Sequence, residues 1–470
     1  MKKLRIAATL LLVLSMTLSL IACGGGTQGT SEQSTAAQTE STPAADTSAS
    51  ANTPSGEKVK LKVSLFSDGQ NLSQTQKDVF KSFTKDHPNI DPEFMYLTSD
   101  TGNWNGYLTK IQTMIAGGQA PDVAVLGLEG VAMMVMNNIA MPIDDYVNAH
   151  MDEYGSILEN IPEQLAEIFI VDGKRYGIPM EANSVVTNIN MDRFKEAGLD
   201  MPKADWTIDD LKAIAPKLSD PKNGKYAFGV PTNFFCLQAL LYSNGGSPLN
   251  DDWSAGAINS PQNIEVFQFL QDAIKNGWAP QPEPSISDVQ LMTQGRIAIG
   301  WWGRWVTNDY VASGIKNIYV QTLPKMQSQK TCAGSAAFIV LNSTKHPEEA
   351  KTLAAWTAKF DYVNTFMAKG SLPANTEFAA QLCPALGVPQ NWEAYTDVYK
   401  QDNWRRSQDP PEYAELGFVY QKYMNIIYAD QMPVKEALDK AQEEIQQVFA
   451  NSQYRKDPAS LKIIDSLFKN

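Results

Sequence analysis

Tryptophans, rather than nucleophiles or metal ligands, are the residues of this chain whose type and spacing indicate chemistry. The sequence has ten, and Trp301, Trp302 and Trp305 stand together with Arg304 between them. A flat aromatic ring covers the apolar C–H face of a sugar, while carboxylates, amides and guanidinium groups hydrogen-bond to the hydroxyls around its rim. The segment therefore favours a carbohydrate over a polyamine or a ferric ion as ligand.

Catalytic signatures are missing from the sequence. There is no GxSxG, P-loop, HExxH or GxGxxG motif in the body of the chain, and only three histidines occur in 470 residues. We therefore predict a protein that is not an enzyme and has no cofactor or metal. A glycosidase needs only two carboxylates, so a surface carbohydrate-active enzyme stays open as an alternative. The formal charge of −13 argues against nucleic acid as a partner.

The four cysteines form no CxxC pair, which excludes a thioredoxin-like site and a zinc ribbon. We expect Cys236, Cys332 and Cys383 to be buried small residues, although a disulfide between two of them remains open in an oxidising location. The first cysteine, Cys23, has a separate role.

The N-terminus reads as a lipoprotein signal. Basic residues precede an apolar run over residues 6–21, and Leu20-Ile21-Ala22-Cys23 looks like a lipobox. We predict that residues 1–22 are a signal peptide and that Cys23 carries the lipid, palmitate included. Residues 23–57 should then be a disordered tether, since they contain no aromatic residue. This places the protein on the extracytoplasmic face of the cell membrane, held only by its anchor.

The body from Lys58 onward reads as α/β. Runs at 59–66, 90–97 and 122–126 are typical of strands, and apolar spacing predicts helices over 71–86 and from Trp104 to Gly117-Gly118. Asp172-Gly173 is a hairpin turn signal. Thr207 and Asp210 have the spacing of a capping box, and Pro433 opens a C-terminal amphipathic helix. Strands alternating with helices imply a mostly parallel sheet with ligands at its carboxyl ends.

Several segments in order resemble the extracellular solute-binding proteins of ABC sugar importers, which include maltodextrin-binding proteins. Residues 104–125 read WNGYLTKIQTMIAGGQAPDVAV, 172–179 read DGKRYGIP, 295–305 read GRIAIGWWGRW and 334–350 read GSAAFIVLNSTKHPEEA. The resemblance implies a type II periplasmic-binding-protein-like fold of two α/β lobes, whose cleft closes on a ligand. It also implies delivery to ABC transporter permease subunits by a monomer.

The same resemblance implies a division of the chain. The hinge would be crossed near 181–183, 321–324 and 372–375. The first lobe would hold residues 58–181 plus 324–373, and the second 182–323 plus 374–470.

Ligand-binding residues are carried over from the family by position. Trp305, ten residues after Gly295, matches its main stacking tryptophan, and Glu129, seven after Asp122, matches a sugar-binding carboxylate. Asn183 stands where the family has a glutamate. The remaining candidates follow the first strand, flank Asn183 or Trp305, or stand in for a C-terminal tryptophan; they are Asp68, Gln70, Glu181, Trp301, Trp302, Arg304 and Tyr413.

Other interpretations stay open at this point. Trp104 and Tyr107 lie on the apolar face of a helix, which favours core packing. If Trp301 and Trp302 are in a strand, they point to opposite faces, so at most one stacks on a ligand. Glu129 is equally suited to a helix N-terminus. Arg405-Arg406 favours a solvated pair, and the same fold binding a polyamine, an anion or a peptide is the alternative function.

Overall fold

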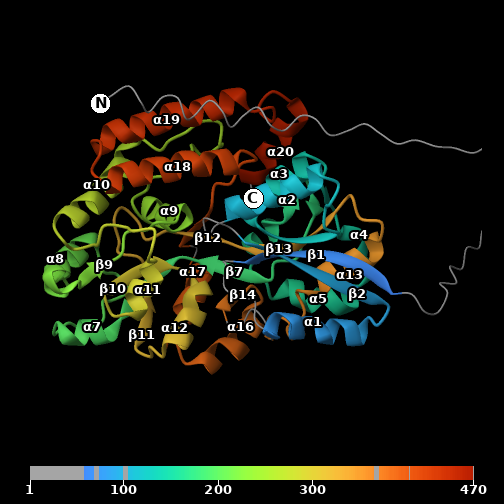
Figure 1. The fold of residues 1–470 in the computed structure, drawn as a ribbon, viewed down its shortest axis with the longest axis horizontal. Helices are drawn as coiled ribbons and strands as arrows, with labels where there is room; N and C mark the ends of the chain where they lie inside the picture. Colours follow the sequence, from blue (N-terminus) through green and yellow to red (C-terminus); the bar gives the residue numbers. More distant parts are fainter. Residues whose placement is uncertain (1–57, 68–73, 99–103, 365–369, 402, 469–470) are drawn as a thin grey trace, which may run out of the picture. The chain divides into compact units, whose positions relative to one another are not determined.

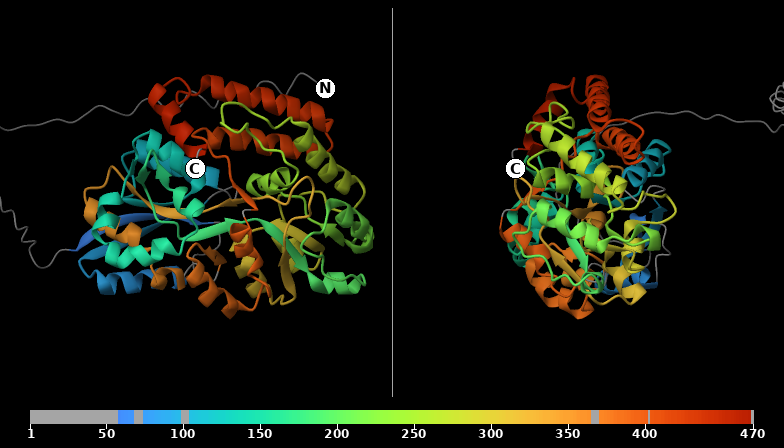
Figure 2. Two further views of the ribbon diagram at one scale, coloured as in Figure 1. Left: turned by 180° about the vertical axis from the view of Figure 1, so that it is seen from behind. Right: turned by 90° about the vertical axis from the view of Figure 1, so that its left-hand side faces the viewer.

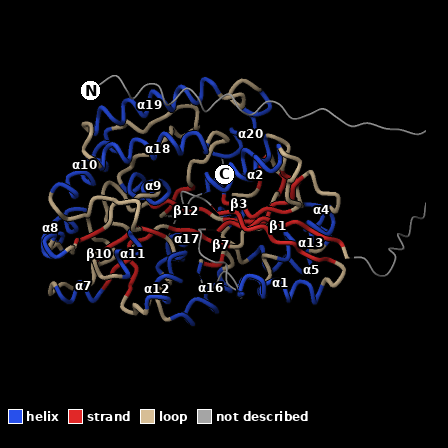
Figure 3. Tube along the Cα trace, in the orientation of Figure 1, coloured by secondary structure: helices blue, strands red, loops and turns tan. Residues whose placement is uncertain are grey.

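The computed structural model describes residues 58–67, 74–98, 104–364, 370–401 and 403–468, all within one unit of the chain, residues 56–470. The predicted signal peptide, Cys23, Asp68 and Gln70 lie outside these residues. Within them, no helix combines the length and the apolar character that a membrane span requires. In Figure 1 the strands run between layers of helices, and Figure 3 shows this layering by secondary structure.

The first lobe is built on a five-stranded sheet. Leu61, Val63 and Leu65 alternate with exposed lysines, and this period of two produces the first strand. This strand, Val59–Ser67, runs parallel to both of its neighbours, Ile90–Thr98 and Val123–Gly127. The strand Ala336–Leu341 pairs antiparallel with Val123–Gly127. In spatial order the strands are β2 (Ile90–Thr98), β1 (Val59–Ser67), β3 (Val123–Gly127), β13 (Ala336–Leu341) and β4 (Ala140–Met141).

Helices cover this sheet, and a hairpin lies beside it. The hairpin pairs β5 (Ile170–Val171) with β6 (Lys174–Arg175) around the predicted Asp172-Gly173 turn, where Asp172 has a φ of 47°. The helices of this part are α1 (Gln74–Asp86), α2 (Trp104–Ala116), α3 (Leu128–Met136), α4 (Asp144–Ala149), α5 (Met151–Glu159), α6 (Glu163–Glu167), α13 (Pro347–Trp356) and α14 (Phe360–Tyr362).

The second lobe has a four-stranded sheet. One of its two inner strands, Ile297–Trp302, is buried along its whole length, so this strand lies in the middle of the lobe's core. The order is β11 (Ile318–Gln321), β8 (Val186–Asn190), β10 (Ile297–Trp302) and β9 (Tyr226–Phe228). Around it lie α7 (Met191–Glu196), α8 (Ile208–Leu218), α9 (Phe234–Ser243), α10 (Pro261–Lys275), α11 (Asp288–Thr293) and α12 (Thr307–Ser313), with 3-10 turns at Pro221–Asn223 and Arg304–Val306. The predicted capping box opens α8, with Thr207 as its N-cap.

A third sheet connects the two lobes. We call it the connecting sheet; its strands are β14 (Leu372–Pro373), β7 (Glu181–Ser184), β12 (Thr331–Gly334) and β15 (Trp404–Arg406). β7 leads into β8 of the second lobe, and β12 returns into β13 of the first. Gln321 belongs to β11, and the strand that pairs with β7 begins at Thr331; the hinge crossing near 321–324 stays a prediction. The lobe boundaries themselves remain a prediction.

The C-terminal helices form a layer of their own. α18 (Tyr413–Tyr428) and α19 (Val434–Asn451) run side by side and pack on α10, as both views in Figure 2 show. Val434, Leu438 and Ile445 form the predicted buried face of α19. α20 (Pro458–Phe468) contacts α3 and β5 of the first lobe, and the assignment of residues 374–470 to the second lobe stays a prediction. The segment between also holds α16 (Thr376–Leu382), a 3-10 turn at Cys383–Leu386 and α17 (Ala394–Lys400).

Candidate functional site

Glu129 lies where the central strand of the first lobe runs into a helix. β3 ends at Gly127, and the N–H of Leu128 donates to Ser335 O at 3.0 Å as α3 begins. Glu129 is thus in the first turn of α3, where the helix dipole favours a negative charge. Its side chain is nevertheless buried, with 6% of the residue exposed. The helix-terminus interpretation and the site interpretation therefore do not exclude one another.

The indole of Trp104 lies close to Gly127, as the Glu129 carboxylate does. A Cβ atom built at Gly127 would lie 2.2 Å from Glu129 Oε2 and 2.8 Å from the Trp104 ring, so a glycine is needed here. Phe66 supports the indole from behind, with ring centroids 4.7 Å apart. Tyr107 is fully buried and its hydroxyl bonds to Ser64 Oγ at 2.8 Å. The predicted core role is confirmed for Tyr107, and Trp104 is half-buried and packs against the same core.

Trp305 extends from the short 3-10 turn that follows β10. It is half-buried, and its ring lies over Gly303, where a built Cβ atom would come within 2.0 Å of it. Phe235, at the start of α9, meets this ring edge-on with centroids 6.1 Å apart. Because β9 and β10 are parallel, their carboxyl ends deliver both aromatic residues to the same end of the second-lobe sheet.

The residues beside Trp305 are more deeply buried. Trp301 is 2% exposed and packs on Phe228 with centroids 5.1 Å apart. Trp302 is also buried, and its Nε1 donates to Tyr310 OH at 2.6 Å. Arg304 is buried as well and donates to Ser371 O next to β14. The three side chains are thus more deeply buried than Trp305, which is half-buried although it also packs against the core.

The two lobes meet at Gly334 of β12. A Cβ atom built there would lie 2.4 Å from Leu128 of the first lobe and 3.3 Å from Phe235. α18 also packs on α2, with Gly417 against Asn105. Tyr413, the first residue of α18, is close enough to Glu129 that burial together with this charge raises the pKa of its hydroxyl. We call the set that gathers here the interlobe cluster; it consists of Trp104, Glu129, Phe235, Trp305 and Tyr413.

A buried polar network adjoins the cluster from the second lobe. Ser407 Oγ donates to Asp409 Oδ1 at 2.9 Å, and Gln238 Nε2 donates to Ser407 Oγ at 3.0 Å. Asp409 is fully buried, and this burial raises the pKa of its carboxyl to about 7, against the opposing charge of Arg406. Arg406 is itself half-buried, so the prediction of a solvated arginine pair is wrong for this member.

Burial likewise raises the pKa of Glu129, and the charges of Asp409 and Glu181 raise it further. Glu181 lies on β7, where Asn183 Nδ2 donates to its Oε1 at 2.9 Å. Burial raises the pKa of Glu181, and the hydrogen bonds from Ser371 and Asn183 partly offset this. Asn183 is half-buried on the same strand. Within the described ranges, no three His, Cys, Asp or Glu side chains are arranged to hold a metal ion.

The sequence analysis did not single out Phe235 or Asp409. Phe235 follows the carboxyl end of a short strand, which is a position where such a fold presents ligand contacts. Asp409 precedes Pro410-Pro411 in a segment with no regular pattern, and no local signal distinguishes it. Cys236, Cys332 and Cys383 are buried and unpaired, as expected for small core residues.

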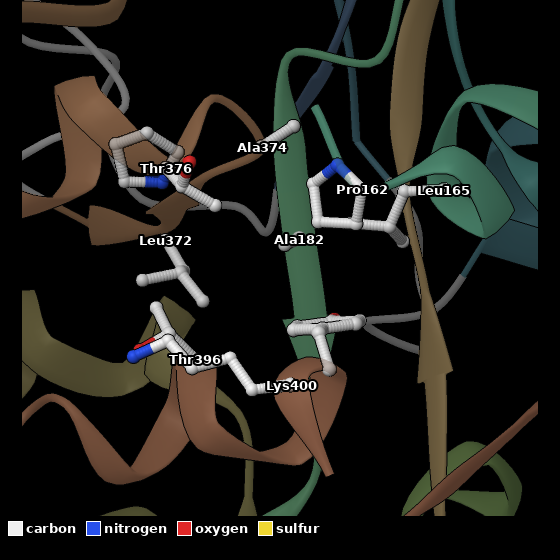
Figure 4. Close-up of a pocket in the computed structure, with 10 residues that line it drawn as sticks. Pro162, Leu165, Ala182, Leu372, Ala374, Thr376, Thr396 and Lys400 are labelled. Carbon is white, nitrogen blue, oxygen red and sulfur yellow. The ribbon is translucent and has the colours of Figure 1, made fainter. Parts of the chain in front are cut away.

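An apolar cavity of about 210 Å³ lies behind the connecting sheet (Figure 4). Ala182 and Leu372 line it from the sheet, Leu165 from α6, and Thr396 and Lys400 from α17. Side chains alternate along a strand, so Ala182 faces away from Glu181 and Asn183 on β7. The cavity is thus separate from the interlobe cluster and contains none of the predicted ligand contacts.

Comparisons with known proteins agree with this architecture. An arabinooligosaccharide-binding protein of Halalkalibacterium halodurans is 26% identical over 321 residues, 64% of each chain. An ABC substrate-binding protein from Listeria monocytogenes, solved in complex with cycloalternan, matches with a TM-score of 0.76 and 24% identity over 84% of this chain and 100% of its own.

A solute-binding protein from Thermotoga lettingae bound with alpha-D-tagatose matches with a TM-score of 0.72 and 22% identity over 83% of this chain and all of its own. The predicted two-lobe α/β fold is therefore confirmed. The model of the bacterial extracellular solute-binding proteins matches residues 67–359, more than half of the sequence. This chain belongs to the family of bacterial extracellular solute-binding proteins.

Proposed function

We propose that this protein is a lipid-anchored binding protein that captures a carbohydrate, in particular an oligosaccharide, and delivers it to the permease of an ABC importer. The observation that carries the proposal is the interlobe cluster. A half-buried tryptophan near a carboxylate comes from the first lobe, and a second half-buried tryptophan comes from the other lobe.

The chemistry of the cluster suits a sugar. Trp104 and Trp305 offer apolar faces of the size of a pyranose ring, and aromatic surface of this kind supplies most of the affinity in well-packed sites. Glu129 and Tyr413 offer an acceptor and a hydroxyl for the rim of the ring. Asp68, Gln70 and Asn183 remain proposed contacts from the resemblance. The relatives named above bind arabinooligosaccharides, cycloalternan or tagatose, which supports the same class of ligand.

A polyamine is the second candidate. Glu129 Oε2 and Asp409 Oδ2 are buried and have no hydrogen-bond partner among the described residues, which would suit a cationic ligand. The aromatic members of the cluster favour the sugar, since an ammonium chain needs no flat apolar face of this extent. A surface carbohydrate-active enzyme is the third candidate, and it would change the sugar chemically.

A thermal-shift screen separates these candidates. The protein is heated with mono- and oligosaccharides, with spermidine and alone; a ligand at 100 times its Kd stabilises the folded state by about 2.7 kcal/mol. We expect a raised Tm with an oligosaccharide and none with spermidine, and chromatography should return the sugar unchanged. A shift with spermidine alone would overturn the carbohydrate proposal, and a shortened sugar would indicate an enzyme.

Closure and anchoring have their own tests. Small-angle scattering should give a smaller radius of gyration with the stabilising sugar while the circular dichroism spectrum stays the same. Cys23→Ser should release the protein from the membrane fraction or leave it unprocessed, and Cys236→Ser, a buried cysteine of the second lobe, serves as the control. A Cys23→Ser protein that still pellets with membranes and carries lipid would refute the anchor.

A further inference from the structure

Helix α18 contains a glycine where a better helix former would be expected. Gly417 is the one glycine among its sixteen residues, which read YAELGFVYQKYMNIIY. Inside a helix glycine is less favourable than alanine, because it loses more backbone freedom on folding. The reason for a glycine here therefore lies outside the helix, in the element that packs against it.

Asn105 of α2 occupies the space that a side chain at position 417 would take. A Cβ atom built at Gly417 would lie 2.0 Å from Asn105 Nδ2, 3.1 Å from its Cγ and 3.4 Å from its Oδ1. Turning the amide about its last bond would leave Cγ in place. Only 8% of Asn105 is exposed, so its side chain has little room to withdraw. The two helices meet this closely because residue 417 has no side chain.

These two helices are anchored in different lobes. α2 belongs to the first lobe, where the hydroxyl of Tyr107 bonds to Ser64 Oγ of β1 at 2.8 Å. α18 belongs to the second lobe, where Tyr420 stacks on Phe234 of α9 with ring centroids 3.8 Å apart. α2 and α18 pack on each other (Figure 1), so this glycine contact joins the two lobes.

The contact also lies beside the interlobe cluster. Trp104 precedes Asn105 along α2, and Tyr413 lies four residues before Gly417, on the same face of α18. The separation of the two helices thus sets the distance between cluster members that come from different lobes.

We propose that Gly417 is a positioning residue for sugar binding, because its missing side chain lets α18 approach α2 closely enough for Trp104 and Tyr413 to enclose one ligand. This inference rests on the proposed capture of a sugar between the two lobes. It adds the residue that sets how closely the lobes approach each other there.

Gly417→Ala tests the positioning role. The added methyl group overpacks the contact, which should raise the Kd for the sugar found by the screen by roughly 5- to 150-fold. The Tm of the sugar-free protein should stay the same or rise, because alanine is the better helix former and separated helices have room for it. Gly155→Ala, inside α5 where a Cβ atom has room, is the matched control and should leave the Kd at the wild-type value.

Asn105→Ala adds a readout that a merely structural role of Gly417 would not change. It removes the amide that the methyl group meets, so Gly417→Ala should raise the Kd little further in the Asn105→Ala background. A rise in Kd that is equally large in both backgrounds would overturn the proposal. So would a Gly417→Ala protein that binds the sugar as the wild type does, whether or not its Tm has fallen.

A crosslink tests the approach of the helices without any sugar. Asn105 Cγ, 3.1 Å from the built Cβ atom, is one bond from its own Cβ, which brings the two Cβ atoms within the separation of about 3.5–4.5 Å that a disulfide needs. Asn105→Cys combined with Gly417→Cys should therefore crosslink under mild oxidation, seen as a reversible mobility shift in non-reducing gel electrophoresis. Asn105→Cys combined with Phe418→Cys is the control and should not, since Phe418 is 64% exposed.

The two experiments separate this inference from the proposed function. A protein that binds the sugar but forms no crosslink between positions 105 and 417 would refute the inference alone. A protein that forms the crosslink yet binds no sugar in the screen would support the close approach of the helices and refute the proposed function.

Discussion

Replacing Trp305 by alanine is the sharpest test of the site. In the structure the indole is half-buried and meets Phe235 edge-on, so it is not a fully buried core residue. A stacking aromatic residue at the centre of a binding site contributes about 2–4 kcal/mol, so Trp305→Ala should weaken sugar binding by roughly 30- to 1000-fold. If Trp305 were fully buried, its removal would instead lower the free energy of unfolding of the unliganded protein by about 3–5 kcal/mol. The observed exposure predicts a smaller loss of Tm.

Trp301→Ala is the matched control, since it removes the same side chain four residues earlier. Trp301 is 2% exposed and packs on Phe228, so this change should lower the Tm of the unliganded protein strongly. In the molecules that still fold, its Kd should stay near the wild-type value. Calorimetric titration with the sugar found by the screen and a melting curve without sugar are measured on both variants. A Trp305→Ala protein with wild-type affinity and a collapsed Tm would refute the reasoning and move the stacking role to Trp302.

Three further changes follow from the same contacts. Gly127→Ala should reduce sugar affinity by about tenfold or more at little cost in Tm, because the added methyl group displaces the adjacent carboxylate and indole. Gly155→Ala, where a Cβ atom has room within α5, is the control. Equal sugar affinities of the two variants would contradict this prediction. Arg455→Met should destabilise the protein by about 3–5 kcal/mol in denaturant titrations, since it leaves the buried Glu412 carboxylate unpaired. Adding Glu412→Gln should recover part of this loss. A single Arg455→Met variant as stable as the double variant would speak against the ion pair as the cause. Burial raises the pKa of Asp288 to about 7, so the stability that its protonated carboxyl contributes is lost as the pH rises through 7. Asp288→Asn should therefore raise the Tm at pH 8 but not at pH 4. An equal change of Tm at both pH values would exclude this cause.

Local elements could be predicted well because their signals are local. The alternation in residues 59–66 and the helical spacing after Pro433 gave elements that the structure contains with small shifts of their ends. The Thr207 capping box is present with both of its hydrogen bonds. β12 could not be predicted, because its burial depends on pairing with β7, a partner far away in the sequence.

The candidate site was predictable only where a motif marks it. Trp305 and Glu129 stand out through their spacing from Gly295 and Asp122, and both lie in the interlobe cluster. The spacing could not tell that Trp301 is buried in the second lobe while Trp305 is only half-buried. That difference arises where β10 ends and the backbone turns at Gly303.

The sequence by itself determined the lipobox-like N-terminus, the α/β alternation and the family resemblance, since each depends on neighbouring residues or on an ordered set of short segments. The tertiary structure alone decided that the carboxylates of Glu129, Glu181 and Asp409 are buried, and that Trp104 and Glu129 both lie close to Gly127. The physical reason is that charge and burial depend on distance in space. Chain segments remote in sequence create these surroundings only when the two lobes and the connecting sheet pack together.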